Sequence, residues 1–261
     1  MAMPADFWVC IPARLASSRL PNKVLQPIGD APMIVHVVKA ALRSEAHKVV
    51  LAYDDEAIAE CIRGVGDLSE TRRVELVKTR PDHASGTDRL VEVAKTLEAC
   101  DGQIMVNLQG DEPLMPAQLL NDVAELLAHS SDASVATAAC PITSATEWAN
   151  PAAVKVVTDA QARALYFSRA AIPVTRDSAD AKQPSRGALR HIGLYAYRAG
   201  ALVLYGQWPE GRLEQLERLE QLRWLENGHK IVVRHLQQAP PAGVDTAEDL
   251  ERVRVHWASG L

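Results

Sequence analysis

A short loop near the N-terminus gathers residues that could hold a highly charged anion. The apolar run Phe7 to Ile11 stops at Pro12, and the small residues after it are interspersed with the cations Arg14, Arg19 and Lys23. Small residues let backbone N–H groups approach a ligand closely, and three neighbouring cations favour a polyanion such as a triphosphate. The alternative is a solvated basic loop that only joins a strand to a helix, since surface loops are commonly charged.

Two acidic residues far apart in the sequence could hold a divalent cation. Asp111 follows an apolar run and Gly110, and Asp245 follows a loop that contains Gly243. Carboxylates at the edge of a sheet suit Mg²⁺, which takes a few carboxylate oxygens together with phosphate oxygens and water. Each residue also has a structural alternative, because Asp111 could cap a turn and Asp245 could be the N-cap of the last helix, in a capping box with Glu248.

Several well-known motifs are absent from the sequence. It has no Gly-x-x-x-x-Gly-Lys-[Ser/Thr] loop and no Gly-x-Ser-x-Gly elbow, and Gly64-Val-Gly66 lacks the third glycine of a dinucleotide-binding loop. These absences disfavour P-loop kinases and ATPases, NAD-dependent Rossmann enzymes and α/β-hydrolases.

The composition of the chain argues against several further classes of protein. The net charge of -5 gives no general attraction to nucleic acid. The N-terminus does not resemble a signal peptide, and no run approaches the roughly 18 apolar residues of a membrane span. The widely spaced cysteines Cys10, Cys61, Cys100 and Cys140 match no metal site and indicate reduced thiols. We therefore expect a cytoplasmic protein that neither binds nucleic acid nor inserts into a membrane.

The elements that must position these residues alternate between strand and helix. Helical patterns follow the predicted strands, which are Phe7 to Ile11, Lys48 to Tyr53, Glu75 to Lys78, Gln103 to Leu108, Ala133 to Cys140 and Ile231 to Leu236. This rhythm predicts an α/β fold with a mostly parallel sheet, whose ligands bind at the carboxyl ends of the strands.

From Pro141 the rhythm changes. Short strands are predicted at Val154 to Thr158, Ala164 to Phe167 and Arg190 to Tyr197, with a mobile polar loop from Pro173 to Ala188. Because no flexible linker precedes this region, it indicates an inserted lobe and not a separate domain.

A helix is predicted from Arg212 to Glu226. Its leucines at 213, 216, 219, 222 and 225 recur every third residue and so wrap around the helix. Such a helix must be covered on several sides, either within one subunit or partly by a second copy of the chain.

Eight motifs, taken in order, carry a resemblance to a known family. They are Pro12-Ala13-Arg14, Ser18-Arg19-Leu20-Pro21-Asn22-Lys23, Arg80-x-Asp82-His83-x-Ser85-Gly86-Thr87-Asp88-Arg89, Gln109-Gly110-Asp111-Glu112-Pro113, Tyr166-Phe167-Ser168-Arg169, Arg190-His191-x-Gly193-x-Tyr195, Leu219-Glu220-Gln221-Leu222-Arg223 and Gly243-Val244-Asp245-Thr246. The set resembles 3-deoxy-manno-octulosonate cytidylyltransferases, the CMP-Kdo synthetases. The resemblance extends from about Val9 to Arg254, and its specificity lies in the ordered set and not in any single motif.

The resemblance implies a nucleotidyltransferase fold, a glycosyltransferase-A-like three-layer sandwich with a mostly parallel central sheet and a smaller inserted lobe. Residues 1–261 would form one domain, in which about 141–212 contains the sugar-binding and dimerisation lobe. The implied reaction joins CTP and 3-deoxy-D-manno-octulosonate (Kdo) to give CMP-Kdo and pyrophosphate, with Mg²⁺. The product would activate Kdo for lipopolysaccharide biosynthesis, and the working form would be a cytoplasmic homodimer.

The resemblance also implies roles for individual residues. Arg14, Lys23 and Asp111 would be catalytic, with Asp111 and Asp245 as the magnesium ligands. The nucleotide would be held by Arg14, Lys23, Ser85, Arg89 and Gln109, and the sugar by Arg169, His191, Tyr195, Glu220 and Gln221, with Arg169 facing the sugar carboxylate. Each sugar residue has an ordinary alternative: His191 could be a core histidine, Glu220 and Gln221 solvated helix residues, and Arg169 the partner of a surface acid.

Three other functions remain open at this point. The nearest is a cytidylyltransferase for a different acidic sugar, such as sialic acid. A catalytically silent nucleotide-binding module is disfavoured by the complete set of candidate residues. A glycosyltransferase would be expected to carry an Asp-x-Asp metal motif, which Asp111-Glu112-Pro113 does not supply.

Overall fold

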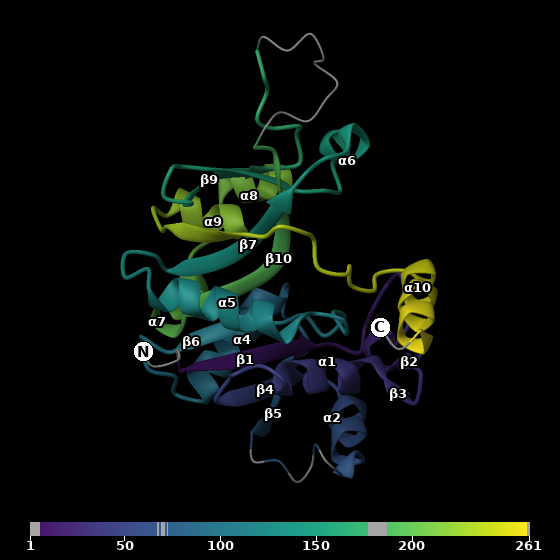
Figure 1. The fold of residues 1–261 in the computed structure, drawn as a ribbon. Helices are drawn as coiled ribbons and strands as arrows, with labels where there is room; N and C mark the ends of the chain where they lie inside the picture. The colour runs from purple at the N-terminus through teal and green to yellow at the C-terminus, as the bar shows by residue number, and fades with distance from the viewer. Residues whose placement is uncertain (1–5, 67, 69–70, 72, 177–186, 260–261) are drawn as a thin grey trace.

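The computed structural model describes residues 6–66, 68, 71, 73–176 and 187–259, and over these the chain builds one large mixed sheet (Figure 1). The strands are β1 (Phe7–Ala13), β4 (Lys48–Tyr53), β5 (Val74–Lys78), β6 (Ile104–Asn107), β7 (Val135–Pro141), β8 (Lys155–Thr158), β9 (Ala164–Ser168), β10 (Leu189–Arg198) and β11 (Ile231–His235). Their order is β11-β7-β10-β6-β1-β4-β5, with β8 paired to β10 and β9. Only β10 is antiparallel to its neighbours along that order, so the central sheet is mostly parallel, as predicted.

Helices cover both faces of the sheet. They are α1 (Met33–Leu42), α2 (Glu56–Arg63), α4 (Gly86–Thr96), α5 (Ala117–Ala128), α6 (Ala145–Ala149), α7 (Ala199–Tyr205), α8 (Arg212–Glu217), α9 (Gln221–Glu226) and α10 (Ala247–Ala258). Alternate residues of β1 enter opposite cores: Val9 packs with α1, α2 and α5, whereas Cys10 packs with α4, α7 and α9. This alternation confirms the three-layer sandwich.

Strand β1 continues to Ala13, two residues beyond the predicted end. The carbonyl of Cys10 accepts from the N–H of Leu108, on the side of β1 that faces β6. Pro12, two residues later, faces the same side, but β6 has ended before it reaches Pro12. The missing N–H of a proline therefore costs no ladder hydrogen bond.

The prediction of one helix from Arg212 to Glu226 is wrong. The chain forms α8 and α9, and Arg218 between them has a φ of 54°, in the left-handed region. The sequence contains no glycine or proline at this point. The break coincides with contacts from β9 to Glu217, which no helical pattern could reveal.

The predicted N-cap of α10 is also wrong by one residue. Thr246 is the N-cap, since its hydroxyl accepts from the N–H of Asp249 (3.2 Å) while the Asp249 carboxylate accepts from the N–H of Thr246 (3.0 Å). This capping box satisfies helix-end donors without Asp245, whose carboxylate is turned elsewhere. Helix α2 is capped by Asp55, whose carboxylate accepts from the N–H of Ala57 at 2.9 Å.

The region 141–212 is not uniform. Strand β10 lies within the central sheet, between β6 and β7, whereas α6 and the β8–β9 pair stand at one end of the molecule (Figure 1). The part of the predicted mobile loop at 177–186 lies outside the described residues. Helices α6 and α7 were not predicted.

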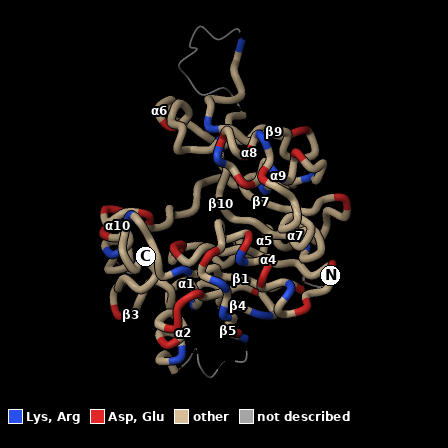
Figure 2. Tube along the Cα trace, turned by 180° about the vertical axis from the view of Figure 1, so that it is seen from behind, with Lys and Arg blue, Asp and Glu red and all other residues tan. Residues whose placement is uncertain are grey.

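Charges of both signs are spread along the chain, including α10, where Arg252 pairs with Asp249 and Arg254 with Glu251 (Figure 2). The four cysteines are free thiols, of which Cys10 and Cys140 are buried. In the described part of the chain, no helix combines the length and the apolar character needed to cross a bilayer.

Candidate active site

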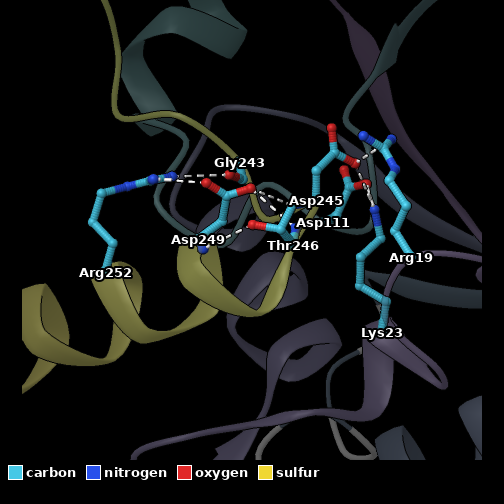
Figure 3. Close-up of polar contacts among 8 residues, drawn as sticks. All are labelled: Arg19, Lys23, Asp111, Gly243, Asp245, Thr246, Asp249 and Arg252. Atoms are coloured by element: carbon cyan, nitrogen blue, oxygen red, sulfur yellow. Dashed lines mark hydrogen bonds and ion pairs between the residues drawn. The ribbon is translucent and has the colours of Figure 1, made fainter.

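Lys23 lies between two carboxylates that are distant in the sequence (Figure 3). Its Nζ donates to Asp111 Oδ2 and, at 3.1 Å, to Asp245 Oδ1, and the guanidinium of Arg19 reaches the same Asp245 oxygen at 3.0 Å. Burial acts against the charged ammonium, but the two carboxylates prevail and raise the pKa of Lys23. The structure therefore brings two of the three predicted cations, Arg19 and Lys23, to one point with both predicted acids.

Two loops deliver these carboxylates. Asp111 follows β6 and Asp245 precedes α10, and the N–H of Val244 donates to the carbonyl oxygen of Asp111 at 2.9 Å. This backbone hydrogen bond fixes the spacing of the loops independently of the charges they carry.

Glu112 is a residue of this site that sequence reasoning missed. Burial, together with the negative charges of Asp111 and Asp245, raises the pKa of its carboxyl group to about 8. Glu112 therefore keeps its proton to a higher pH than an ordinary glutamate does. Its position directly after Asp111 was the available signal.

A cleft of about 270 Å³ opens beside Lys23, and we call it the Lys23 cleft. It is lined by predicted site residues from five separate segments, namely Arg14, Lys23, Ser85, Arg89, Gln109, Asp111, Glu220 and Asp245. Arg14 is exposed on the rim, and Arg19, also in the lining, strengthens the positive charge of that wall.

Buried and partly buried polar contacts hold the part of the cleft lining that α4 contributes. Ser85 caps α4, so its hydroxyl accepts from the N–H of Asp88. The buried Arg89 donates to Thr79 and to Asp54 Oδ2 (3.2 Å), and Asp54 also accepts from the N–H of Leu15 (3.0 Å). Asp54 therefore joins the N-terminal loop to α4, a connection invisible in the sequence.

A second pocket adjoins the first and shares Gly86, Gln109 and Glu220 with it; we call it the Tyr195 pocket. Its lining includes three of the predicted sugar residues, Tyr195, Glu220 and Gln221. Burial raises the pKa of Glu220, although hydrogen bonds from Thr87 and Ser85 oppose this shift.

The other two predicted sugar residues line neither of these pockets. His191 lines a separate groove with Glu112 and Asp245, its Nε2 lies 3.0 Å from Thr137 Oγ1, and burial lowers its pKa to about 3. Arg169 directs its guanidinium to three backbone carbonyls, those of Pro151, Glu217 and Arg218. Direct contact of either residue with a sugar stays a prediction.

The donor set fits a magnesium ion. No cluster of three or more His, Cys, Asp or Glu side chains suited to a metal occurs among the residues that the structure describes. However, Asp111 and Asp245 already aim oxygens at one cation, the ammonium of Lys23. Two carboxylates are sufficient where Mg²⁺ also takes oxygens from water and a phosphorylated substrate.

Comparison with known proteins agrees with this geometry. A family model described as cytidylyltransferase matches residues 8–231. The 3-deoxy-manno-octulosonate cytidylyltransferase of Acidovorax sp. (strain JS42) is 50% identical over 264 residues, covering 97% of this chain and 98% of the relative. That of Serratia proteamaculans (strain 568) is 50% identical over 251 residues, covering 95% and 98% respectively.

A solved structure leads to the same family. CMP:2-keto-3-deoxy-manno-octonic acid synthetase complexed with CTP superposes with a TM-score of 0.88 at 39% identity, covering 98% of this chain and all of the other. The extent and identity of these matches establish that the chain belongs to the 3-deoxy-manno-octulosonate cytidylyltransferase family.

Proposed function

We propose that this chain is an enzyme that transfers the cytidylyl group of CTP to Kdo, giving CMP-Kdo and pyrophosphate. The observation that carries the proposal is the convergence of Lys23, Asp111 and Asp245 in a cleft that Ser85 and Gln109 also line. A related enzyme at 39% identity has been solved in complex with CTP, which supports this choice of nucleotide.

The nucleotide would lie in the Lys23 cleft. Arg14 and Lys23 would bind the phosphates, and Ser85, Arg89 and Gln109 would shape the remainder of the site. Asp111 and Asp245 would hold Mg²⁺, which, when bound, would neutralise phosphate charge and polarise the phosphorus centre. Lys23 would exchange part of its contact with these carboxylates for contact with the triphosphate.

The acidic sugar would lie in the adjoining Tyr195 pocket, near Glu220 and Gln221. The oxygen of its anomeric hydroxyl would bond to the α-phosphorus, while the bond from that phosphorus to the bridging oxygen breaks and pyrophosphate leaves with that oxygen. The hydroxyl proton would pass to water. Such a transfer depends chiefly on alignment and on charge neutralisation, which Arg14 and Lys23 would provide.

We extend the proposal to the setting of the enzyme. The chain would act as a single domain, with the sugar-binding and dimerisation surface within about 141–212. It would work as a homodimer in the cytoplasm, and its product would supply lipopolysaccharide biosynthesis.

Pyrophosphate release tests the proposal. The purified chain is incubated with Mg²⁺, each of the four nucleoside triphosphates, and either Kdo, sialic acid or no sugar. We expect release only with CTP and Kdo. Release with sialic acid instead would assign a different acidic sugar, and nucleotide binding without release would indicate a silent binding module.

A further inference from the structure

One wall of the Tyr195 pocket is the chain that joins α8 to α9. Residues 218–221 line the pocket consecutively, and the last two are Glu220 and Gln221. Where these side chains point therefore depends on how the helix breaks. A helix that ran straight from Arg212 to Glu226 would place them differently.

Glu217, the last residue of α8, connects this break to the end of β9. Its carboxylate accepts from Ser168 Oγ at 2.6 Å and from the N–H of Arg169 at 3.0 Å. The backbone carbonyl of Glu217 also accepts, from Arg169 Nε at 2.7 Å. The side chain of Glu217 is thus bound to Ser168 and Arg169, and its backbone is bound to Arg169 as well.

Arg169, to which Glu217 is bound, is itself held in place by Lys155. Lys155 is fully buried, and its ammonium donates to the carbonyl of Arg169 at 2.6 Å as well as to those of Asn150 and Ala153. A buried ammonium satisfied by three carbonyls cannot move without a large loss of hydrogen bonding. The point to which Glu217 is attached is therefore rigid.

A second contact sets the direction of α9. Arg223 on α9 forms two hydrogen bonds of 2.6 Å to the buried carboxylate of Glu214 on α8. Between these contacts, Arg218 adopts a left-handed conformation, with a φ of 54°, that is unfavourable for a non-glycine residue. Such a conformation persists only where its surroundings determine it.

We propose that Glu217 is a positioning residue for the reaction described above, acting through Glu220 and Gln221. By attaching the end of α8 to Ser168 and Arg169, it breaks the helix at Arg218 and holds the pocket wall toward the sugar. The inference rests on the proposed function for its kinetic consequence but on the structure alone for the geometry. No direct contact between Glu217 and a substrate is required.

Steady-state kinetics test the kinetic consequence. Glu217→Ala is expected to raise the KM for Kdo about tenfold, with the KM for CTP within about twofold of wild type. Glu217→Gln keeps the chain length and an acceptor oxygen, so it is expected to recover part of the loss. If the KM for Kdo does not change in folded Glu217→Ala, the positioning role is wrong.

Glu226→Ala is the matched control. The Glu226 carboxylate also accepts backbone N–H groups of α8, those of Leu213 (2.9 Å) and Glu214 (3.3 Å), but at the opposite end of that helix from the break. Its loss should lower the melting temperature without a selective rise in the KM for Kdo. If the KM for Kdo rises equally in both variants, Glu217 only stabilises α8 and has no specific positioning role.

Amide hydrogen exchange tests the geometry without the reaction. The N–H groups of Leu222 and Arg223 bond back to Leu219 and Glu220 and so report on the break. We expect faster exchange there in Glu217→Ala than in Glu226→Ala. If exchange in Glu217→Ala is unchanged, the inference is wrong even if the enzyme is active. If the wild-type chain is inactive, the proposed function is wrong, and the exchange rates alone decide whether Glu217 holds the pocket wall.

Discussion

Gly243 lies so close to Glu112 that a Cβ atom at position 243 would be 2.8 Å from the carboxyl carbon of Glu112 and 3.0 Å from the backbone oxygen of Asp111. A Cβ atom there would force the carboxyl end of the half-buried Glu112 side chain to move aside and would press against the backbone of Asp111, which is less free to yield. The absence of a side chain at 243 is what allows the loop before α10 to reach the loop after β6.

Gly243→Ala is therefore expected to separate the two loops and to misplace Asp245. Because small misplacements of reacting groups are costly, pyrophosphate release should fall about 10- to 100-fold. The matched control is Gly102→Ala, in an exposed turn where a Cβ would meet nothing within 4 Å. Full activity of folded Gly243→Ala would show that the close approach has no catalytic importance.

Lys23→Ala and Asp111→Ala should each lower the rate by about a hundredfold or more, which corresponds to about 3 kcal/mol of activation free energy. The reason is that each removes a charge from the point where Lys23, Asp111 and Asp245 converge. Pyrophosphate release measures the rate of each variant, and circular dichroism checks that each variant is folded.

The control pair for these variants is Lys230→Ala and Asp132→Ala. These two residues form an exposed ion pair of 2.7 Å that lines none of the pockets described above, and its loss should leave the rate unchanged. Near-normal turnover by folded Asp111→Ala would remove the magnesium assignment.

Asp245 and Thr246 are adjacent, yet their substitutions should have opposite consequences. Asp245→Asn is expected to raise the Mg²⁺ concentration for half-maximal rate about tenfold with little change in stability. Thr246→Ala removes the N-cap of α10 and should lower the free energy of unfolding by about 1 kcal/mol. Magnesium titrations and urea unfolding of both variants make the comparison, and a greater loss of stability in Asp245→Asn would contradict it.

His191 should make the stability of the fold depend on pH. Its pKa is about 3 in the folded chain, whereas an unfolded histidine takes up a proton near pH 6.5. The unfolded state therefore binds more protons between these values, and the free energy of unfolding should fall as the pH falls from about 6.5, by at most about 1.4 kcal/mol per pH unit.

His191→Gln removes this titration and should flatten the dependence between about pH 5 and 7 relative to wild type. Urea unfolding at several pH values measures both slopes. Equal slopes would mean that His191 is protonated alike in the folded and unfolded chains.

Local sequence rules were sufficient for most of the sheet and for the kinds of residue in the site. Apolar runs that alternate with helical patterns predicted β4 to the residue. Residue type and position after a strand were enough to single out Lys23 and Asp111. These features depend on neighbours a few residues away, which a sequence displays directly.

Only the tertiary structure decided what depends on distant neighbours. The convergence of Asp111 with Asp245 and the break after Glu217 both rest on contacts that join separate segments. Local conformational preferences differ by a kilocalorie per mole or less, so one or two long-range hydrogen bonds are enough to overrule them. For this chain, the sequence determined which chemical groups are available, and the packing of loops and helices around the sheet decided which of them meet.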